Sequence, residues 1–581
     1  MEDKQLWHRV EEMSTLDKIT EQIIRRSLLY ASEEMGIALR NAAYSPNIKD
    51  RMDHSAAIFD SEGRLLAQAE HIPVHLGSLP WGLKNLISAS IKFGLPFEEG
   101  SMIVANNPYI TGTHLNDVTV VAPIYFKDEL VGFTANKAHH SDVGGNVPGS
   151  INIDSKTLFD EGFVLDPKYL MRKNVFIDDL LMFFSSHSRM PSERLGDLRA
   201  QAAANITGTR RVQQIISKYG LTTFKAAARE SFCYSESLTR HRISALNKGI
   251  YTAQDYLEHP DGYDSKLKAK LTISEQNIEV DYTGTDKELD FSLNAVFGVT
   301  LSGVYFVVRS ILGDDIPANH GAFAPISVVA PKGTIVNPSF PHPVGGGNVE
   351  TTQRNADLLY CAFSKAVPDK VPAASGGSMN NVMIGGLHNG NSWAFYETIA
   401  VGLGGRKSMD GIDGIQSNMT NTMNTPIEEI ERSMPLLITK YEFRVDSSGA
   451  GEYRGGSGVI RSYRMVSDST IFTVLAERER HGPWGLFGGE EGAKTSVILQ
   501  RNNKRHKIST KGTFRLKKDD EVHIHTAGGG GYGFADRRDK QRIKEDVNNG
   551  LISRTRAEED YKIEFGRSEY NLSHLSQNEK N

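Results

Sequence analysis

Apolar residues near the start of the chain recur at close to the helical period. The segment opens with the capping pattern Ser14-x-x-Asp17, and Pro46, which disfavours helix at the residue before it, follows its end. This pattern predicts a long amphipathic helix over residues 14–43. Its periodic apolar positions are Leu16, Ile19, Ile23, Leu28 and Met35.

Short apolar runs separated by turn residues follow the predicted helix. Asp60-Ser61-Glu62-Gly63 and Lys127-Asp128 each separate two such runs, which is the pattern of a β-hairpin. We therefore expect two hairpins and one further strand in the N-terminal part. The expected strands are residues 56–59, 65–69, 102–105, 118–126 and 129–136.

The remaining chain alternates helical and β-rich patterns. Residues 179–249 have a helical pattern, strands return near 271–282 and 452–473, and β-rich runs with many glycines continue to Gly533. These patterns predict a multi-domain α+β protein with mixed β-sheets, a long N-terminal helix and a helical middle region. The expected units are 1–178 (N-terminal α+β), 179–260 (mainly helical), 261–470 (central α+β), 471–534 (β-rich with glycines) and 535–581 (charged helical tail).

Composition narrows the class of protein. The 581 residues are 39% hydrophobic and 24% charged, which is ordinary for a globular chain. A net charge of −5, without a basic run interleaved with aromatics, argues against nucleic acid as a partner. Cys233 and Cys361 are too few for a disulfide scaffold or a cysteine-based zinc site. Because we find neither a signal peptide nor a membrane span, we expect a cytoplasmic protein.

Histidines and a carboxylate are expected to meet at the open end of the second hairpin. His114 and Asp117 form a His-x-x-Asp motif directly before the strand 118–126, and His139 and His140 follow the return strand. With Lys127-Asp128 at the turn, Asp117 would lie opposite the residue before His139, about 5 Å away. Either histidine could turn inward, since a register change of one residue exchanges the two faces.

Two imidazoles and a carboxylate, without a thiolate, suit a zinc, manganese or iron ion. Asp53, at the head of the first hairpin, is the candidate for a further oxygen ligand, and a bound ion would acidify water or polarise a carbonyl. The same residues also fit a structural interpretation, in which His-x-x-Asp caps a turn and Asp53 caps a strand. Glu70, His71 and His75 could contact a substrate, but we favour surface-loop positions for each of them.

Other patterns have alternative interpretations. Residues 488–496 lack the spacing of a phosphate-binding loop, because Ala493 separates Gly492 from Lys494. Two glycine runs, 345–347 and 528–531, could cradle a phosphate or form tight turns, and we favour turns for the second. The charged run 477–482 suggests a solvated rim or a subunit contact.

Several longer strings resemble the hydantoinase B/oxoprolinase family, over about residues 16–565. By this resemblance the family's metal ligands correspond to Asp53, His114, Asp117 and His139, although some relatives have glutamate where Asp53 stands. The strings are Arg40-Asn-Ala-Ala-Tyr-Ser-Pro46, Asp50-Arg-Met-Asp53, residues 67–80, 105–109, Gly112-Thr-His-Leu-Asn-Asp-Val118, Ala138-His-His-Ser-Asp-Val-Gly-Gly145, and residues 193–201, 343–348 and 526–533.

The resemblance implies a two-subunit enzyme. Family members pair with a hydantoinase A-like subunit, or domain, that binds ATP and phosphorylates the amide or carbonyl oxygen of a substrate. It implies that this chain is the metal-binding subunit of a hetero-oligomeric, ATP-dependent hydrolase of hydantoins, 5-oxoproline or lactams, and that ATP is bound by the partner. His140 or Glu70 could transfer a proton. The alternatives are a subunit of a ketone (acetone or acetophenone) carboxylase and a non-catalytic scaffold subunit.

Overall fold

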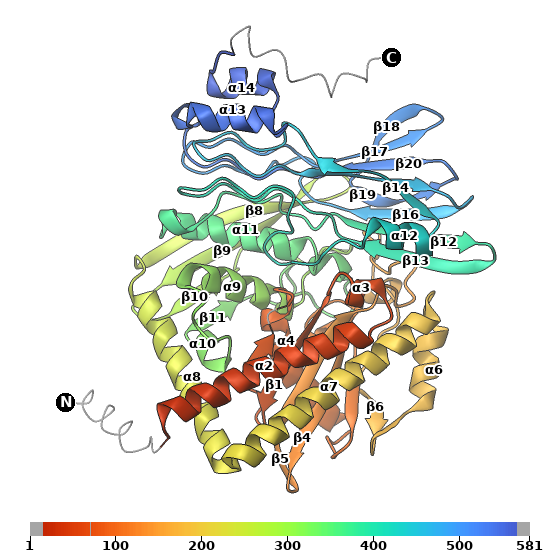
Figure 1. Ribbon diagram of the computed structural model, residues 1–581, viewed down its shortest axis with the longest axis vertical. Coiled ribbons are helices and arrows are strands. Elements are labelled where there is room, and N and C mark those ends of the chain that lie inside the picture. Colours follow the sequence, from red (N-terminus) through yellow and green to blue (C-terminus); the bar gives the residue numbers. More distant parts are fainter. Residues whose placement is uncertain (1–15, 70, 566–581) are drawn as a thin grey trace.

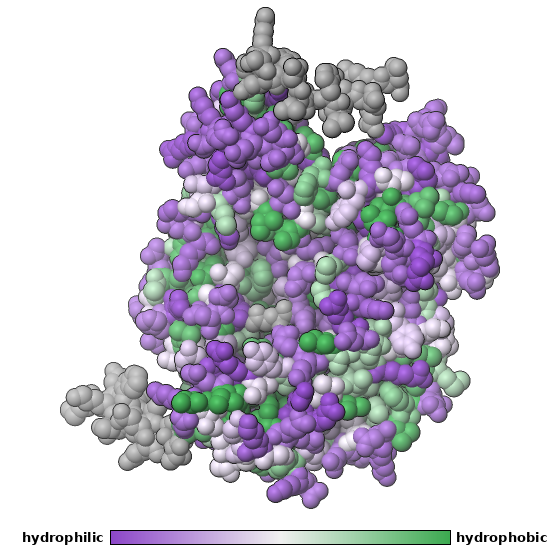
Figure 2. All heavy atoms as spheres, in the orientation of Figure 1, coloured by the Kyte–Doolittle hydropathy of each residue, from purple (hydrophilic) through white to green (hydrophobic). Residues whose placement is uncertain are grey.

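The computed structural model describes residues 16–69 and 71–565 (Figure 1). Within these residues the chain combines helices with four β-sheets, which confirms the expected α+β class. On the face shown in Figure 2, hydrophilic side chains predominate and hydrophobic ones form small separate patches. None of the described helices is both long and apolar enough to cross a lipid bilayer.

A seven-stranded antiparallel sheet forms the N-terminal part of the fold. Its order is β2-β1-β5-β4-β3-β6-β7, so both predicted hairpins lie side by side in one sheet. The strands are β1 (His54–Asp60), β2 (Leu65–Ala69), β3 (Met102–Ala105), β4 (Asp117–Phe126), β5 (Glu129–His139), β6 (Lys168–Arg172) and β7 (Val175–Phe176).

Helices cover both faces of this sheet. The predicted N-terminal helix, α2 (Lys18–Ala42), packs on one face beside α7 (Pro191–Tyr219), and α4 (His75–Lys92) packs on the other. Side chains alternate along β1, so Ile58 joins the core beneath α2 and Phe59 joins the core beneath α4. A strand buried on both faces has no polar alternation. Asp17 caps α2, whereas Ser14 of the expected cap lies outside the described residues.

The β4–β5 hairpin departs from the expected register. Phe126 pairs with Glu129 as predicted, but a β-bulge at Val131 shifts the pairing by one residue from there on. Asp117 therefore pairs directly with His139 instead of with the preceding residue. The expected register was wrong because a bulge residue such as Val131 cannot be recognised from the sequence of an apolar strand.

The middle of the chain is helical as expected and leads into a second sheet. This four-stranded sheet has the order β11-β10-β9-β8, and α9 and α11 share its hydrophobic core. Its strands are β8 (Gly249–Glu258), β9 (Asp264–Ile273), β10 (Ile278–Asp281) and β11 (Ile326–Val329). The other α-helices before the C-terminal tail are α3 (Pro46–Lys49), α5 (Pro108–Thr111), α6 (Asp178–Ser186), α8 (Leu221–Ser244), α9 (Phe297–Leu312), α10 (His320–Phe323), α11 (Thr351–Ser364) and α12 (Ile427–Ser433).

Two further sheets share one core near the C-terminal end. Their orders are β13-β12-β16-β19 and β14-β15-β20-β17-β18, and residues such as Phe472 and Tyr463 fill the space between them. The strands are β12 (Asn381–His388), β13 (Asn391–Glu397), β14 (Leu436–Phe443), β15 (Val459–Met465), β16 (Thr470–Leu475), β17 (Ser496–Arg501), β18 (Lys504–Ile508), β19 (Lys511–Leu516) and β20 (Glu521–His525). The described part of the charged tail forms two helices, α13 (Lys540–Asn548) and α14 (Arg554–Tyr561).

The glycine run 528–531 packs against other backbone segments. A Cβ atom at Gly455 would lie 1.9 Å from the carbonyl oxygen of Gly529, and one at Gly402 would lie 1.9 Å from that of Gly456. No side chain fits at such a distance, so only glycine allows this approach. The run thus has a structural role, as favoured, but in stacked segments that the turn interpretation did not foresee.

The charged run 477–482 begins in the interior, so a solvated rim is wrong for its first two residues, whereas Arg480 and His481 are partly exposed. Glu477 and Arg478 are fully buried. Glu477 lies 3.0 Å from Arg354, and Arg478 lies 2.7 Å from Asp357, in each case as an ion pair with α11. Glu477 and Arg478 each pair with an opposite charge that lies more than 100 residues away in the sequence. A local sequence pattern does not reveal such partners.

Candidate metal centre

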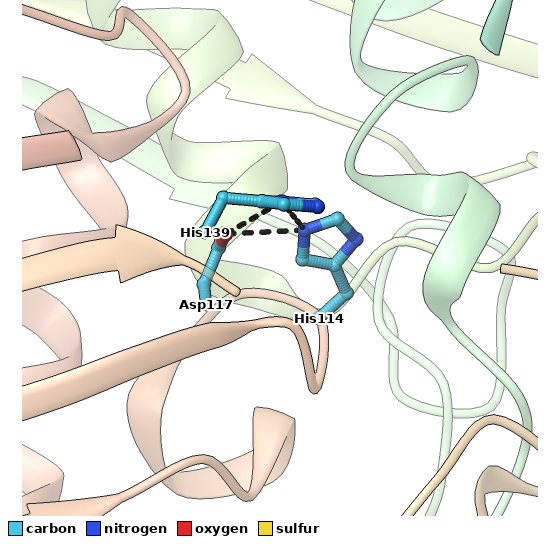
Figure 3. Close-up of side chains that lie close together, drawn as sticks. All are labelled: His114, Asp117 and His139. Carbon is cyan, nitrogen blue, oxygen red and sulfur yellow. Dashed lines mark hydrogen bonds and ion pairs between the residues drawn. The ribbon is translucent and has the colours of Figure 1, made fainter. Parts of the chain in front are cut away.

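His114, Asp117 and His139 meet at the open end of the β4–β5 hairpin (Figure 3). His114 Nε2 lies 3.1 Å from Asp117 Oδ1 and 3.1 Å from His139 Nδ1. His139 Nδ1 lies 3.3 Å from Asp117 Oδ1. All three side chains are buried. The structure thus brings together three of the four residues proposed as ligands, and His139 is the histidine that faces the cluster.

The loop that positions His114 is tied to the neighbouring strand. Helix α5 ends at Gly112, whose φ of +86° is a left-handed conformation that favours glycine. Lys137 Nζ, from β5, donates to Thr111 O at 2.8 Å and to Thr113 Oγ1 at 2.7 Å. Burial lowers the pKa of Lys137 to about 7. Lys137 was not among the sequence candidates, although its position two residues before His139 places it on the same face of the strand.

Hydrogen bonding fixes the tautomer of His114. Its Nδ1 lies 3.1 Å from the carbonyl oxygen of Gly345, which only accepts, so Nδ1 holds the proton. In the neutral ring Nε2 then presents a lone pair toward Asp117 Oδ1 and His139 Nδ1. Such close acceptors repel one another unless a proton or a cation lies between them. The donor set therefore fits a divalent ion.

Burial and neighbouring charges shift the pKa values of the three residues in different directions. Burial opposes protonation of His114, but Asp117 and the Gly345 carbonyl outweigh it and raise the pKa of His114. Burial likewise opposes ionisation of Asp117, yet hydrogen bonds and charge from His114, His139 and His75 hold its pKa well below the usual range. Burial lowers the pKa of His139, and so favours the neutral imidazole that binds metals.

The second oxygen of Asp117 is held by two further side chains. His75 Nε2 lies 3.3 Å from Asp117 Oδ2, and Asn348 Nδ2 donates to the same oxygen at 3.0 Å. His75 Nδ1 lies 2.9 Å from Ser55 Oγ. His75 is fully buried at the start of α4, so its interpretation as a surface-loop residue was wrong. The glycine run 345–347 contributes a carbonyl and leads to Asn348.

Asp53 and Tyr396 complete the walls of a small cavity. Asp53 Oδ2 lies 3.9 Å from His139 Nδ1, outside the tight cluster but on the same cavity. The ring of Tyr396 stacks on His139 at 4.7 Å between centroids. The cavity of about 20 Å³ has room for an ion or one water molecule. Tyr396 comes from β13, and no local sequence pattern pointed to it.

The other sequence candidates lie elsewhere. The ring of His140 lies 3.0 Å from Gln201 Oε1, and His140 is not among the residues that line the cavity. Burial holds the pKa of His140 well below its usual range. His71 lies 3.5 Å from Glu33, also away from the cavity wall. Glu70 lies outside the described residues.

The fold and this cluster define a multi-domain α+β protein with a buried histidine–carboxylate site suited to a metal ion. The model of the hydantoinase B/oxoprolinase family matches residues 17–535. The chain therefore belongs to this family, as its sequence motifs indicated.

Three relatives show how the family varies in length. An uncharacterized protein of Methanocaldococcus jannaschii is 47% identical over 95% of this chain and 96% of its own length. A protein of Pseudomonas sp. strain NS671, named as a candidate B-type subunit of a D-/L-hydantoinase, is 32% identical over 96% of this chain and 97% of its own. The 5-oxoprolinase of Dictyostelium discoideum is 34% identical over 90% of this chain, which spans only 41% of that enzyme.

Two solved structures share the fold. The ATP-dependent caprolactamase of Pseudomonas jessenii has a TM-score of 0.89 and 27% identity, over 97% of this chain and 99% of its own. A nucleotide-free acetone carboxylase has a TM-score of 0.89 and 19% identity, over 96% of this chain and 81% of its own. The second likeness shows the fold alone.

Proposed function

We propose that this chain is the metal-binding subunit of an ATP-dependent cyclic-amide hydrolase, acting on an amide that a hydantoinase A-like partner phosphorylates. The observation on which the proposal rests is the convergence of His114, Asp117 and His139 on one buried cavity. The likeness to a candidate hydantoinase component and to a caprolactamase supports the substrate class.

The two-subunit logic follows from amide chemistry. Resonance makes an amide a poor electrophile, and phosphorylation of its oxygen removes that resonance. A divalent ion, when bound, supplies Lewis acidity and lowers the pKa of water. In this division of labour the partner activates the ring and this chain supports its opening by water.

Each residue of the site has a specific task in this proposal. Asp117 Oδ1, His114 Nε2 and His139 Nδ1 would hold the ion, because their lone pairs converge. His75 and Asn348 fix the orientation of Asp117 through its second oxygen. The Gly345 carbonyl keeps the proton of His114 on Nδ1 and so directs Nε2 inward.

Asp53 has two possible tasks. Its carboxylate lies on the cavity wall and 3.9 Å from His139 Nδ1, so it can act as a fourth ligand or accept a proton from water. The proton-transfer role suggested for His140 has no contact with the cavity to support it.

The metal content of purified variants tests the proposal. We expect the wild-type chain to retain a stoichiometric divalent ion in elemental analysis and Asp117→Ala to lose it. Asp197→Ala is the matched control, because Asp197 is equally buried but bonds to the backbone amides of Tyr44 and Ser45. Equal metal content in the wild type and Asp117→Ala would refute the proposal.

A ketone carboxylase component is the second candidate function. The acetone carboxylase shares the fold at a TM-score of 0.89, so fold alone does not separate carboxylation from hydrolysis. Consumption of bicarbonate distinguishes the two reactions. A purely scaffolding protein would have no use for the converging lone pairs at His114, Asp117 and His139.

A further inference from the structure

Glu161 is a buried acidic residue that no step of the proposed function uses. It directly follows the short helical turn Leu158–Asp160, and only 2% of it is exposed. Burial of a carboxyl group is unfavourable unless hydrogen bonds compensate for the lost water. The partners of Glu161 therefore indicate what the residue does in the fold.

These partners are backbone amides at the start of a glycine run. Glu161 Oε2 accepts from the N–H of Val344 at 3.0 Å, and Oε1 accepts from the N–H of Gly345 at 2.9 Å. Ser292 Oγ donates to Glu161 and accepts from the N–H of Gly346 at 3.0 Å. Three successive amides thus surround the carboxyl group and its hydroxyl partner, in the manner of a backbone nest that binds an anion.

The glycine run 345–347 permits this arrangement because its residues have no side chains. A Cβ atom at Gly346 would lie 2.0 Å from the backbone oxygen of Ser292. A Cβ atom at Gly345 would lie 3.0 Å from Glu161 Oε1. The sequence left open whether this run cradles a phosphate or forms a tight turn. In the structure its amides hold a carboxyl group of the same chain.

The same run reaches the metal cluster through one carbonyl group. The oxygen of Gly345 lies 3.1 Å from His114 Nδ1 and keeps the ring proton of His114 on that atom. The N–H of Gly345 is bonded to Glu161. A single residue therefore joins the buried carboxyl group to a candidate metal ligand, and a shift of this residue would change both hydrogen bonds.

The ionised form of Glu161 suits the nest. Burial raises the pKa of Glu161 to about 7, while hydrogen bonds from Ser292, Val344 and Gly345 favour the charged form. Above this pH both carboxylate oxygens accept hydrogen bonds from the amides. A glutamine in the same place would have to turn its NH₂ donor toward one of these N–H groups, so it cannot fill the nest.

We infer that Glu161 is a positioning residue of the metal site, which holds the glycine run so that the Gly345 carbonyl fixes the tautomer of His114. The inference deepens the proposed function and rests on its metal site. Without Glu161 the ring proton of His114 can move to Nε2, where Asp117 Oδ1 lies 3.1 Å away as an acceptor. A ring protonated at Nε2 has no lone pair there for an ion, so metal affinity falls.

The ring proton of His114 gives the first test, in the metal-free chain. Nitrogen NMR spectra of the full-length chain, isotopically labelled at histidine, show whether Nδ1 carries a proton, and His114→Asn assigns the signal. The spectra are recorded at about pH 8.5, where Glu161 is ionised. We expect Nδ1 to be protonated in the wild type and to lose its proton in part of the population of Glu161→Gln.

Glu258→Gln is the matched control. Glu258 is also buried, and it accepts from the backbone amides of residues 479–481 at 2.8–2.9 Å. It is not among the residues that line the metal cavity. We therefore expect this variant to lose a similar set of hydrogen bonds and to leave the proton of His114 on Nδ1.

Metal affinity gives the second test, by competition for Zn²⁺ with a chromophoric chelator. Glu161→Gln should bind Zn²⁺ roughly tenfold more weakly than the wild type, the lower end of the loss expected for a residue outside the ligand set. Glu258→Gln should keep the affinity of the wild type. Ser292→Ala, which removes one hydrogen bond to Glu161 and the acceptor of the Gly346 amide, should change both readouts in the same direction. It provides the test if Glu161→Gln does not fold.

The outcomes separate this inference from the proposed function. A proton that stays on Nδ1 of His114 in Glu161→Gln and in Ser292→Ala overturns the inference and leaves the metal site standing. An equal loss of Zn²⁺ affinity in Glu161→Gln and Glu258→Gln does the same, because the effect would then be one of general stability. Absence of Zn²⁺ binding by the wild type would instead contradict the proposed function, and with it the metal role of Glu161, even if the ring proton shifts as expected.

Discussion

At the scale of single residues, two adjacent histidines at the end of β5 have different surroundings. His139 Nδ1 lies 3.1 Å from His114 Nε2, whereas the ring of His140 lies 3.0 Å from Gln201 on α7. Side chains on a strand alternate between faces, so neighbouring residues meet different environments. Chemistry at this site thus depends on which of two identical side chains the register directs inward.

Replacing each histidine in turn tests this difference. We expect His139→Asn to weaken divalent-metal binding by about 100-fold or more, because the variant loses a direct ligand. Loss of a residue that only hydrogen-bonds to a ligand already costs roughly 10–100-fold in metal affinity. His140→Asn should change metal affinity less than about tenfold, since its ring bonds to Gln201 instead. Competitive titration with a chromophoric chelator measures both. Loss of metal from His140→Asn alone would reverse the assignment.

The ligand types could be predicted from the sequence, but the full geometry could not. His114, Asp117 and His139 lie within or beside one hairpin, so turn position and strand length brought them to the same end. The bulge at Val131 then decided the register, and it depends on how the strands twist and pack. Tyr396 joins from a distant strand through tertiary packing alone.

At the scale of elements, Glu350, directly before α11, is linked to the metal site through Asn381 and Tyr396. Glu350 Oε1 accepts from the backbone of Met379 at 3.2 Å and from Asn381 Nδ2 at 2.7 Å, and Oε2 has no partner among the described residues. Asn381 Oδ1 also accepts from the hydroxyl of Tyr396 at 3.0 Å. Tyr396 in turn stacks on His139. Glu350 therefore supports the metal site indirectly, through Asn381 and Tyr396.

The ionisation of Glu350 predicts a pH-dependent stability. Burial and the nearby Glu477 raise the pKa of Glu350 from 4.5 to about 8, against the opposing charge of Lys511. A carboxyl with a raised pKa contributes stability that is fully present below its unfolded pKa, near 4.5, and is lost as the pH rises through about 8. The difference corresponds to roughly 3–5 kcal/mol.

Glu350→Gln should remove this dependence. The variant keeps an acceptor for Met379 and Asn381 but cannot ionise, so we expect its stability relative to the wild type to rise between about pH 5.5 and about pH 8.5. The midpoints of urea unfolding of both proteins at each pH give the difference directly, and effects of other groups cancel. Parallel pH profiles for the two proteins would show that Glu350 does not titrate in this range.

At the scale of the whole molecule, its elements divide into those that local pattern predicts and those that require the assembled fold. Helix α2 and the two N-terminal hairpins follow from periodicity and turn residues within short windows. The stacked glycine segments and the buried residues Glu477 and Arg478 do not, because their partners lie far along the chain.

Dependence on a partner is the prediction that belongs to this scale. The described run 488–496 lacks the spacing of a phosphate-binding loop, and an amide that has not been activated resists attack by water. We therefore expect the purified chain to open neither hydantoin nor ε-caprolactam with ATP present. Addition of a hydantoinase A-like partner should start ATP hydrolysis coupled to ring opening. Chromatography of the ring-opened acid measures this reaction.

Variants and a labelled co-substrate make this assay decisive. In the assembled complex, Asp117→Ala should reduce ring opening by about 100-fold or more, which is of the order expected when an essential electrostatic group at a reacting centre is lost. Asp197→Ala, which is equally buried but does not line the cavity, should retain activity in the fraction that folds. Turnover by the chain alone would contradict the two-subunit proposal. Incorporation of labelled bicarbonate into acetone or acetophenone, with no lactam opened, would replace the hydrolase with the carboxylase, because only carboxylation forms a new carbon–carbon bond.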